Sequence, residues 1–197
     1  MKNSTYVWRQ FTLVFELGSV LKMMLILTNM YIFIMALVLA ILEIQIEGKD
    51  GWAKNLPTWK PPLHTWYAEL YSRLMFKKRL TGYHLAMYLF VILIFFLPYA
   101  DGLPLTLFNG TKTLSLYFLF TVVWDFFWFV LNPNYSLAKF KRQYVPWHVL
   151  WLFGLPADYW AALVLSFVVL TPNFINNYSS NILSWWFLNI ILFGVQT

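Results

Sequence analysis

Twenty consecutive residues without a charge run from Met23 to Leu42 and read MMLILTNMYIFIMALVLAIL. An α-helix rises 1.5 Å per residue, so about 20 apolar residues cross the roughly 30 Å hydrocarbon core of a bilayer. The stretch therefore predicts a membrane-spanning helix, and it sets the expectation for the rest of the chain.

The composition agrees with this expectation over the whole length. The chain has 197 residues, of which 60% are hydrophobic, 21% aromatic and only 11% charged. Soluble domains carry roughly 25% charged residues, so the chain falls outside the globular class. We expect a single integral membrane domain over residues 1–197, all-α and built as a polytopic helix bundle.

Further apolar stretches with helix-ending residues complete the predicted bundle. We expect five transmembrane helices, at about residues 23–43, 83–99, 113–131, 157–172 and 182–195. The last is the shortest, and a re-entrant or interfacial helix is the alternative there.

Three segments outside these spans have the pattern of helices on the membrane surface. Apolar residues at helical spacing predict an amphipathic interfacial helix over about 63–80. Residues 1–21 predict a second one, which Gly18-Ser19 would separate from the first span, and 147–153 predict a short one closed by Gly154.

Basic residues set the expected orientation. Segment 46–82 carries seven Lys and Arg residues and 133–156 carries three, whereas 100–112 carries only Lys112. The positive-inside rule therefore places 46–82 and 133–156 in the cytoplasm. The net charge of +6 reports this topology and contact with anionic lipid, so we expect membrane lipids and no nucleic acid as partners.

Asp125 is the least expected residue of the chain. It lies among Trp124, Phe126, Phe127 and Trp128 in a predicted span. A charge at that depth costs a few kcal/mol on insertion scales, so such residues face a partner group, a metal or water. Alternatively, Asp125 accepts hydrogen bonds from Trp or Tyr side chains or pairs with a Lys or Arg.

Topology brings other polar residues to the same end of the bundle as Asp125. Alternating spans place six of the eleven Asp, Glu and His residues there: Glu43, Glu47, His84, Asp125, His148 and Asp158. Asp158 also fits as a helix-capping residue after Pro156. His64 is expected at the surface.

Carboxylates and imidazoles together form the ligand set of a Zn, Fe or Mn site. The candidate metal ligands are Glu43, Glu47, His84, Asp125 and His148, and the candidate catalytic residues are Asp125 and His148. The absence of cysteine excludes thiolate sites and disulfides. Each of these residues also has a structural interpretation, as a hydrogen-bonded or solvated polar side chain.

Three function classes remain open. The leading hypothesis is a membrane-embedded, metal-dependent enzyme acting on a lipid or isoprenoid-like substrate near the cytoplasmic interface, its apolar tail held by aromatic residues. The alternative is a structural or accessory subunit of a membrane complex, with a membrane-protein partner or a second copy of the chain. The third is a proton-coupled transporter with Asp125 as the titrating group.

Overall fold

A computed structural model describes residues 3–135, 137–175 and 181–197. The described chain is mostly helical, with 67% helix and almost no strand. Its elements, in chain order, are α1 (Asn3–Glu47), α2 (Trp66–Leu74), α3 (Gly82–Ala100), α4 (Leu107–Leu131), the 3₁₀ helix η1 (Leu137–Lys139), β1 (Trp151–Leu152), β2 (Leu155–Pro156), α5 (Ala157–Val168), α6 (Thr171–Ile175) and α7 (Ile182–Gln196).

Four stretches are helical and apolar over a length that could cross a membrane. They are Lys22–Glu47, Gly82–Ala100, Leu107–Leu131 and Ala157–Phe174. Four of the five predicted spans are thus found as helices of sufficient length. The fifth, α7, has only 15 residues, and at 1.5 Å per residue it covers roughly 22 Å, less than a bilayer core.

The helix α4 lies at the centre of the bundle, where it packs against α1 on one side and α5 on the other. The small residues Ala36 and Ala40 of α1 are fully buried in this core beside Phe120 and Val123 of α4. Small side chains let the helix backbones approach each other closely. Helix α7 is tied to α1 by Asn29, whose Nδ2 atom donates to Asn189 Oδ1 at 3.0 Å.

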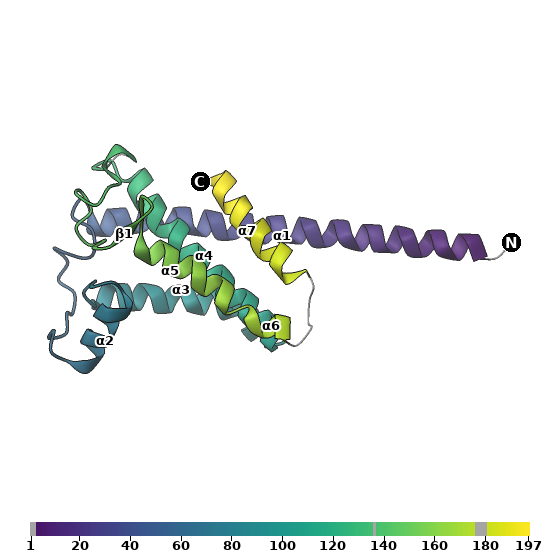
Figure 1. Ribbon diagram of the computed structural model, residues 1–197, viewed down its shortest axis with the longest axis horizontal. Coiled ribbons are helices and arrows are strands. Elements are labelled where there is room, and N and C mark those ends of the chain that lie inside the picture. Colours follow the sequence, from purple (N-terminus) through teal and green to yellow (C-terminus); the bar gives the residue numbers. More distant parts are fainter. Residues whose placement is uncertain (1–2, 136, 176–180) are drawn as a thin grey trace.

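The predicted break at Gly18-Ser19 is wrong, because α1 continues through these residues as one helix from Asn3. A single glycine costs a helix only about 1 kcal/mol, so the surrounding apolar helix formers carry it across. The N-terminal half of α1 extends well beyond the other helices (Figure 1).

The predicted interfacial helix over 63–80 is much shorter in the structure, where α2 covers only Trp66–Leu74. The chain then reverses through Phe76 and Lys77, whose φ angles are 50° and 71°. Left-handed residues cannot continue an α-helix. Apolar residues at helical spacing suggest a longer helix. The reversal instead turns the following residue, Lys78, into the protein interior.

The predicted helix at 147–153 is also wrong. A short antiparallel hairpin pairs Trp151 with Pro156 and Leu152 with Leu155. Its turn residues, Phe153 and Gly154, have φ angles of 51° and 83°, the two consecutive positive values that a type I′ hairpin turn requires. Gly154 is therefore needed for a hairpin turn and not as a helix terminator.

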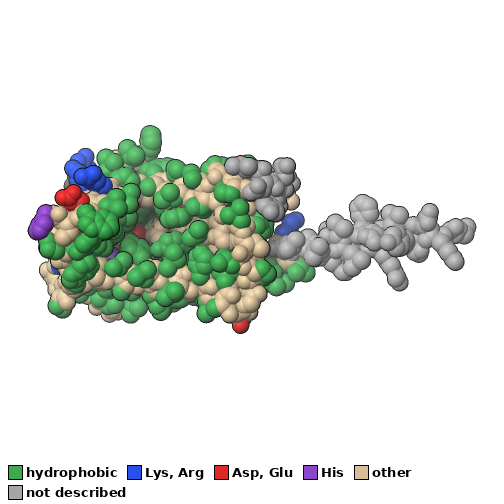
Figure 2. Space-filling view, turned by 90° about the horizontal axis from the view of Figure 1, so that it is seen from below, with side chains coloured by type: hydrophobic (Ala, Val, Ile, Leu, Met, Phe, Trp, Pro, Cys, Tyr) green, Lys and Arg blue, Asp and Glu red, His purple; other side chains and the backbone are tan. Residues whose placement is uncertain are grey.

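Segments 46–82 and 133–156 lie at the same end of the molecule, as the alternation of spans predicts (Figure 1). On the face shown in Figure 2, hydrophobic side chains cover the flank, and basic, acidic and histidine side chains gather at the end that carries α2. We call this the polar end. That it faces the cytoplasm stays a prediction.

Candidate functional site

The polar end holds all six residues that topology was expected to bring together, but it divides them into two groups. The first, which we call the Glu–His cluster, consists of Glu43, Glu47 and His84. The second, the His148 network, consists of Lys78, Asp125, His148, Asp158 and Tyr159.

The Glu–His cluster forms where the end of α1 meets the start of α3. Glu43 and Glu47 lie one helical turn apart and therefore share a face of α1. The Nε2 atom of His84 is 3.5 Å from Glu47 Oε1 and 3.9 Å from Glu43 Oε1. One ligand atom from each of the three residues can be chosen so that all lie within 4.8 Å of one another.

His84 is held in place from two sides. The Oγ1 atom of its N-cap residue, Thr81, accepts from the backbone N–H of His84 and lies 2.8 Å from the Nδ1 atom of the ring. The indole of Trp52 stacks on the imidazole with a centroid distance of 3.9 Å and an interplanar angle of 18°. Both contacts fix the ring plane and leave Nε2 facing the two carboxylates.

The His148 network centres on an imidazole between two carboxylates. His148 Nε2 is 3.2 Å from Asp125 Oδ2, and its Nδ1 is 3.0 Å from Asp158 Oδ1. Tyr159 donates its hydroxyl hydrogen to Asp125 Oδ2 at 2.5 Å, and the Lys78 ammonium group donates to Asp158. The His148 and Lys78 side chains are 0% and 3% exposed, so every charge in the network meets a partner inside the protein.

The geometry requires His148 to carry a positive charge. A neutral imidazole has one donor and one acceptor nitrogen, so only the imidazolium can donate to both carboxylates. Burial alone would lower the pKa of His148. The negative charge of Asp125 and the hydrogen bonds to Asp125 and Asp158 outweigh that effect and raise the pKa above its ordinary value.

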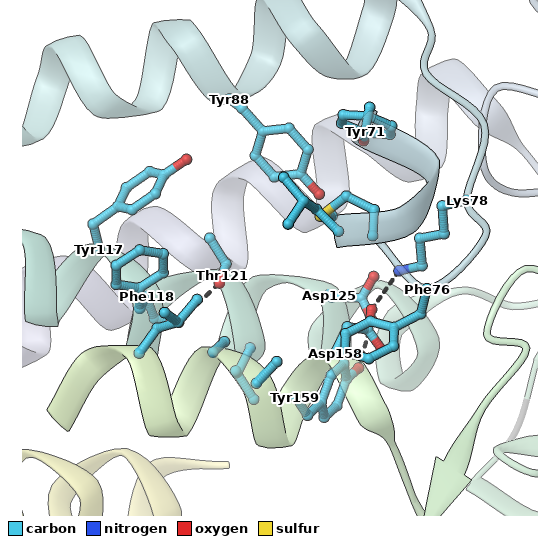
Figure 3. A pocket seen from close by; sticks show the side chains of 16 residues that line it. Tyr71, Phe76, Lys78, Tyr88, Tyr117, Phe118, Thr121, Asp125, Asp158 and Tyr159 are labelled. Carbon is cyan, nitrogen blue, oxygen red and sulfur yellow. Dashed lines mark hydrogen bonds and ion pairs between the residues drawn. The ribbon is translucent and has the colours of Figure 1, made fainter. Parts of the chain in front are cut away.

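An apolar cavity of about 280 Å³ opens beside the His148 network. Its walls come from α3, α4, α5 and the region of α2 (Figure 3). Lys78, Asp125 and Asp158 gather at one end of it, whereas Tyr117 and Phe118 lie toward the other. The cavity is therefore lined mainly by apolar side chains and has charged groups at one end.

Tyrosine hydroxyl groups add polar atoms to this cavity. The hydroxyl of Tyr88 points into it (Figure 3). The hydroxyl of Tyr71 is buried without a hydrogen-bond partner among the described residues. Burial raises the pKa of Tyr71, so this hydroxyl keeps its proton and remains a donor. An unpaired buried hydroxyl costs free energy that a polar group of a ligand would recover.

A second, much smaller cavity of about 20 Å³ lies between the Glu–His cluster and Asp125. Both cavities are lined by Thr121, Asp125 and Tyr88. Asp125 thus lines both the 280 Å³ cavity and the small cavity beside the Glu–His cluster. It is the residue at which the two polar groups meet.

Sequence reasoning missed two members of the His148 network. Lys78 belongs to the basic run 77–79, which has the pattern of a solvated cytoplasmic segment, yet it is buried. Tyr159 directly follows Asp158 in an apolar helix. No sequence pattern distinguishes either from its neighbours. Asp158 lies in the first turn of α5, where a capping acid was expected, and His64 is exposed, as predicted.

Comparison of the chain with protein-family models, with curated protein sequences and with solved structures finds no match.

Proposed function

We propose that the protein is a membrane-embedded enzyme that acts on the polar end of a lipid- or isoprenoid-like molecule. The observation that carries the proposal is the cavity of about 280 Å³, whose apolar walls end at Asp125, Asp158 and Lys78. Ligand pockets are mostly apolar with a few convergent polar groups that fix orientation. An amphiphile with one apolar chain fits this description.

The walls of the cavity support an apolar chain as its occupant. They include Leu74, Phe76, Phe118, Val122 and Leu165. The volume of about 280 Å³ is near the lower limit of roughly 300 Å³ for small-molecule sites. We therefore expect the cavity to hold the reacting end of the substrate and a short part of its chain, the rest extending along the apolar flank of the bundle.

Asp125 is the proposed proton acceptor. Its Oδ2 atom accepts from Tyr159 and His148, while its Oδ1 atom has no hydrogen-bond partner among the described residues. The positive charge of His148 keeps the carboxylate ionised. The free oxygen can then remove a proton from a substrate hydroxyl group or from water and return it to the product.

Lys78 and His148 have distinct roles in this proposal. The Lys78 ammonium group lines the cavity and would stabilise negative charge that develops on the substrate. His148 is buried behind Asp125 and positions it, in addition to setting its charge. Asp158 fixes both cations in place by accepting hydrogen bonds from each.

The accessory-subunit alternative also has an observation in its favour. All charges of the His148 network are paired within the protein, which is what a purely structural interhelical network requires. The two functions differ in what they demand of the cavity: an enzyme needs it open, whereas a structural network does not.

The test compares lipid extracts from cells that express the wild type or single variants at equal levels. Asp125→Asn keeps the shape of the side chain and removes its charge, and Ala162→Phe fills the cavity from α5. The matched control is Asp101→Asn, an exposed acid that caps the C-terminal end of α3. We expect one lipid pair, substrate and product, to change with the wild type and the control but with neither cavity variant. Identical extracts for all four proteins would support the accessory subunit.

A further inference from the structure

The Glu–His cluster brings two acidic side chains together inside the protein. Among the described residues, Glu43 and Glu47 form ion pairs with no Lys or Arg, and the buried Lys78 ammonium group is bound to Asp158 instead. Two buried carboxylates beside a single imidazole repel each other and have lost their hydration. A cation between them would remove both penalties.

The small cavity gives such a cation room. Its volume of about 20 Å³ exceeds the roughly 10–15 Å³ that one water molecule needs, so it holds one small ion or water. The Glu43 and Glu47 side chains and the imidazole of His84 line it, as do Trp124 and Trp128. The cluster therefore borders a small space that can hold an ion or a water molecule.

A second, independent observation concerns a buried hydrogen-bond donor that lines this space. Trp128 is only 3% exposed, and its Nε1 atom is buried without a hydrogen-bond acceptor among the described residues. Buried indole N–H groups normally have a partner. A water or hydroxide bound to a metal ion in the cavity would supply an acceptor oxygen.

The donor atoms define the class of ion. Two carboxylate oxygens and one imidazole nitrogen suit zinc, iron or manganese. Thr81 accepts a hydrogen bond from Nδ1–H in the tautomer that leaves Nε2 free to bind the metal, which is the usual outer support of a metal-binding histidine. Three protein ligands leave coordination positions open, as catalytic sites require.

We propose that Glu43, Glu47 and His84 bind one divalent ion of zinc, iron or manganese, with an open coordination position on the side of Asp125. The site uses three of the five ligands expected from the sequence. His148 is not among them, because both of its ring nitrogens are engaged by carboxylates. The inference goes beyond the proposed function and does not depend on it, since metal binding can be measured without a substrate.

The experiment measures metal content and thermal stability of the full-length protein in detergent. The protein is stripped with a chelator, incubated separately with Zn²⁺, Mn²⁺ or anaerobic Fe²⁺, freed of unbound ion and analysed by elemental mass spectrometry. We expect about one ion per chain for one of the three metals and a higher unfolding temperature in its presence. Glu43→Gln, Glu47→Gln and His84→Gln should each weaken binding at least tenfold, since the loss of even an outer partner of a metal ligand costs roughly 10–100-fold in affinity.

Two exposed residues of the same types provide matched controls, Glu69→Gln in α2 and His64→Gln before it. Both should bind the metal like the wild type. Size-exclusion profiles that match the wild type show which variants are folded, and Glu47→Gln keeps the acceptor for the Ala53 N–H. The inference is overturned if no metal binds the stripped wild type, or if a folded ligand variant retains wild-type affinity.

Discussion

The two polar groups at the same end of the bundle differ in charge balance. The His148 network contains two carboxylates, one ammonium group and one imidazolium, so its charges sum to zero and each meets a partner. The Glu–His cluster has two carboxylates and one imidazole, and no Lys or Arg of the described residues forms an ion pair with it. One group is complete as the chain folds, whereas the other would be completed by the metal ion that we propose.

This difference predicts that removal of a charge changes the stability of the protein in opposite directions in the two groups. In a balanced buried network, the loss of one member leaves another charge unpaired and costs several kcal/mol. In an unbalanced cluster, the loss of one of two like charges relieves repulsion. Variants in the two groups therefore test the comparison directly.

The largest effect is expected for Lys78→Met, which removes the only permanent cation of the balanced network. Asp158 would lose its ammonium partner in a buried setting. We expect a loss of about 3 kcal/mol in the free energy of unfolding, the lower end of the range for breaking a buried ion pair. Denaturant titration of the detergent-solubilised protein measures it.

Lys54→Met is the control for this variant, because its ion pair with Asp50 lies at the surface, the lysine side chain being 71% exposed. Surface pairs contribute about 0–1 kcal/mol. Equal effects of the two substitutions would show that the His148 network is not the buried, balanced group that its contacts indicate.

Binding of a metal ion by the Glu–His cluster should stabilise the protein by a similar amount. A ligand at 100 times its dissociation constant stabilises the folded state by about 2.7 kcal/mol. We expect this gain for the wild type on addition of the bound metal and its loss on addition of a chelator. Glu43→Gln should show neither change. A gain that persists in this variant would place the metal elsewhere.

In metal-free protein, the same Glu43→Gln substitution should raise stability. It removes one of two neighbouring acidic groups, and the glutamine keeps an oxygen that can accept a hydrogen bond. We expect a gain of about 1 kcal/mol, larger than the roughly 0.2–0.5 kcal/mol of exposed like-charge pairs on a helix. One substitution would thus stabilise the empty protein and abolish stabilisation by metal. A loss of stability without metal would mean that the carboxylates already share a proton or a cation.

Only part of the arrangement of these two polar groups can be predicted from the sequence. Alternation of spans correctly placed Glu43, His84, Asp125 and His148 at one end, because helix direction fixes which helix termini lie together. It could not divide them into two groups, since that depends on which way each side chain points. In particular, the buried Lys78 points to Asp158, and no described Lys or Arg pairs with Glu43 or Glu47.

The wrong predictions of secondary structure arise where the chain turns without a usual sequence signal. The apolar periodicity around 63–80 is real, but the left-handed residues Phe76 and Lys77 end the helix early and turn Lys78 inward. Neither is a glycine, so no turn signal marks the reversal. The hairpin at β1 and β2 was missed because Phe153-Gly154 differs from the Asn-Gly pair that usually announces a type I′ turn.

The smallest predicted effect concerns the proton that completes the His148 network. The groups facing His148 are Asp125 from α4 and Asp158 from α5, with Lys78 and Tyr159 bound to those carboxylates. The pKa of His148 is raised in the folded protein, so the folded state binds this proton more tightly than the unfolded state does. The resulting stability is fully present below the unfolded pKa of about 6.5 and is lost as pH rises through the folded pKa.

The measurement is the free energy of unfolding of metal-free protein as a function of pH above 6.5, for the wild type and for His148→Gln. Other groups titrate in both proteins, so the difference between the two curves isolates His148, and it should shrink as pH rises. His64→Gln, at an exposed position, should follow the wild-type curve. A difference that grows with pH would mean that the folded state prefers the neutral imidazole. Only one carboxylate could then accept a hydrogen bond from His148, and the network would lack the charge balance that distinguishes it from the Glu–His cluster.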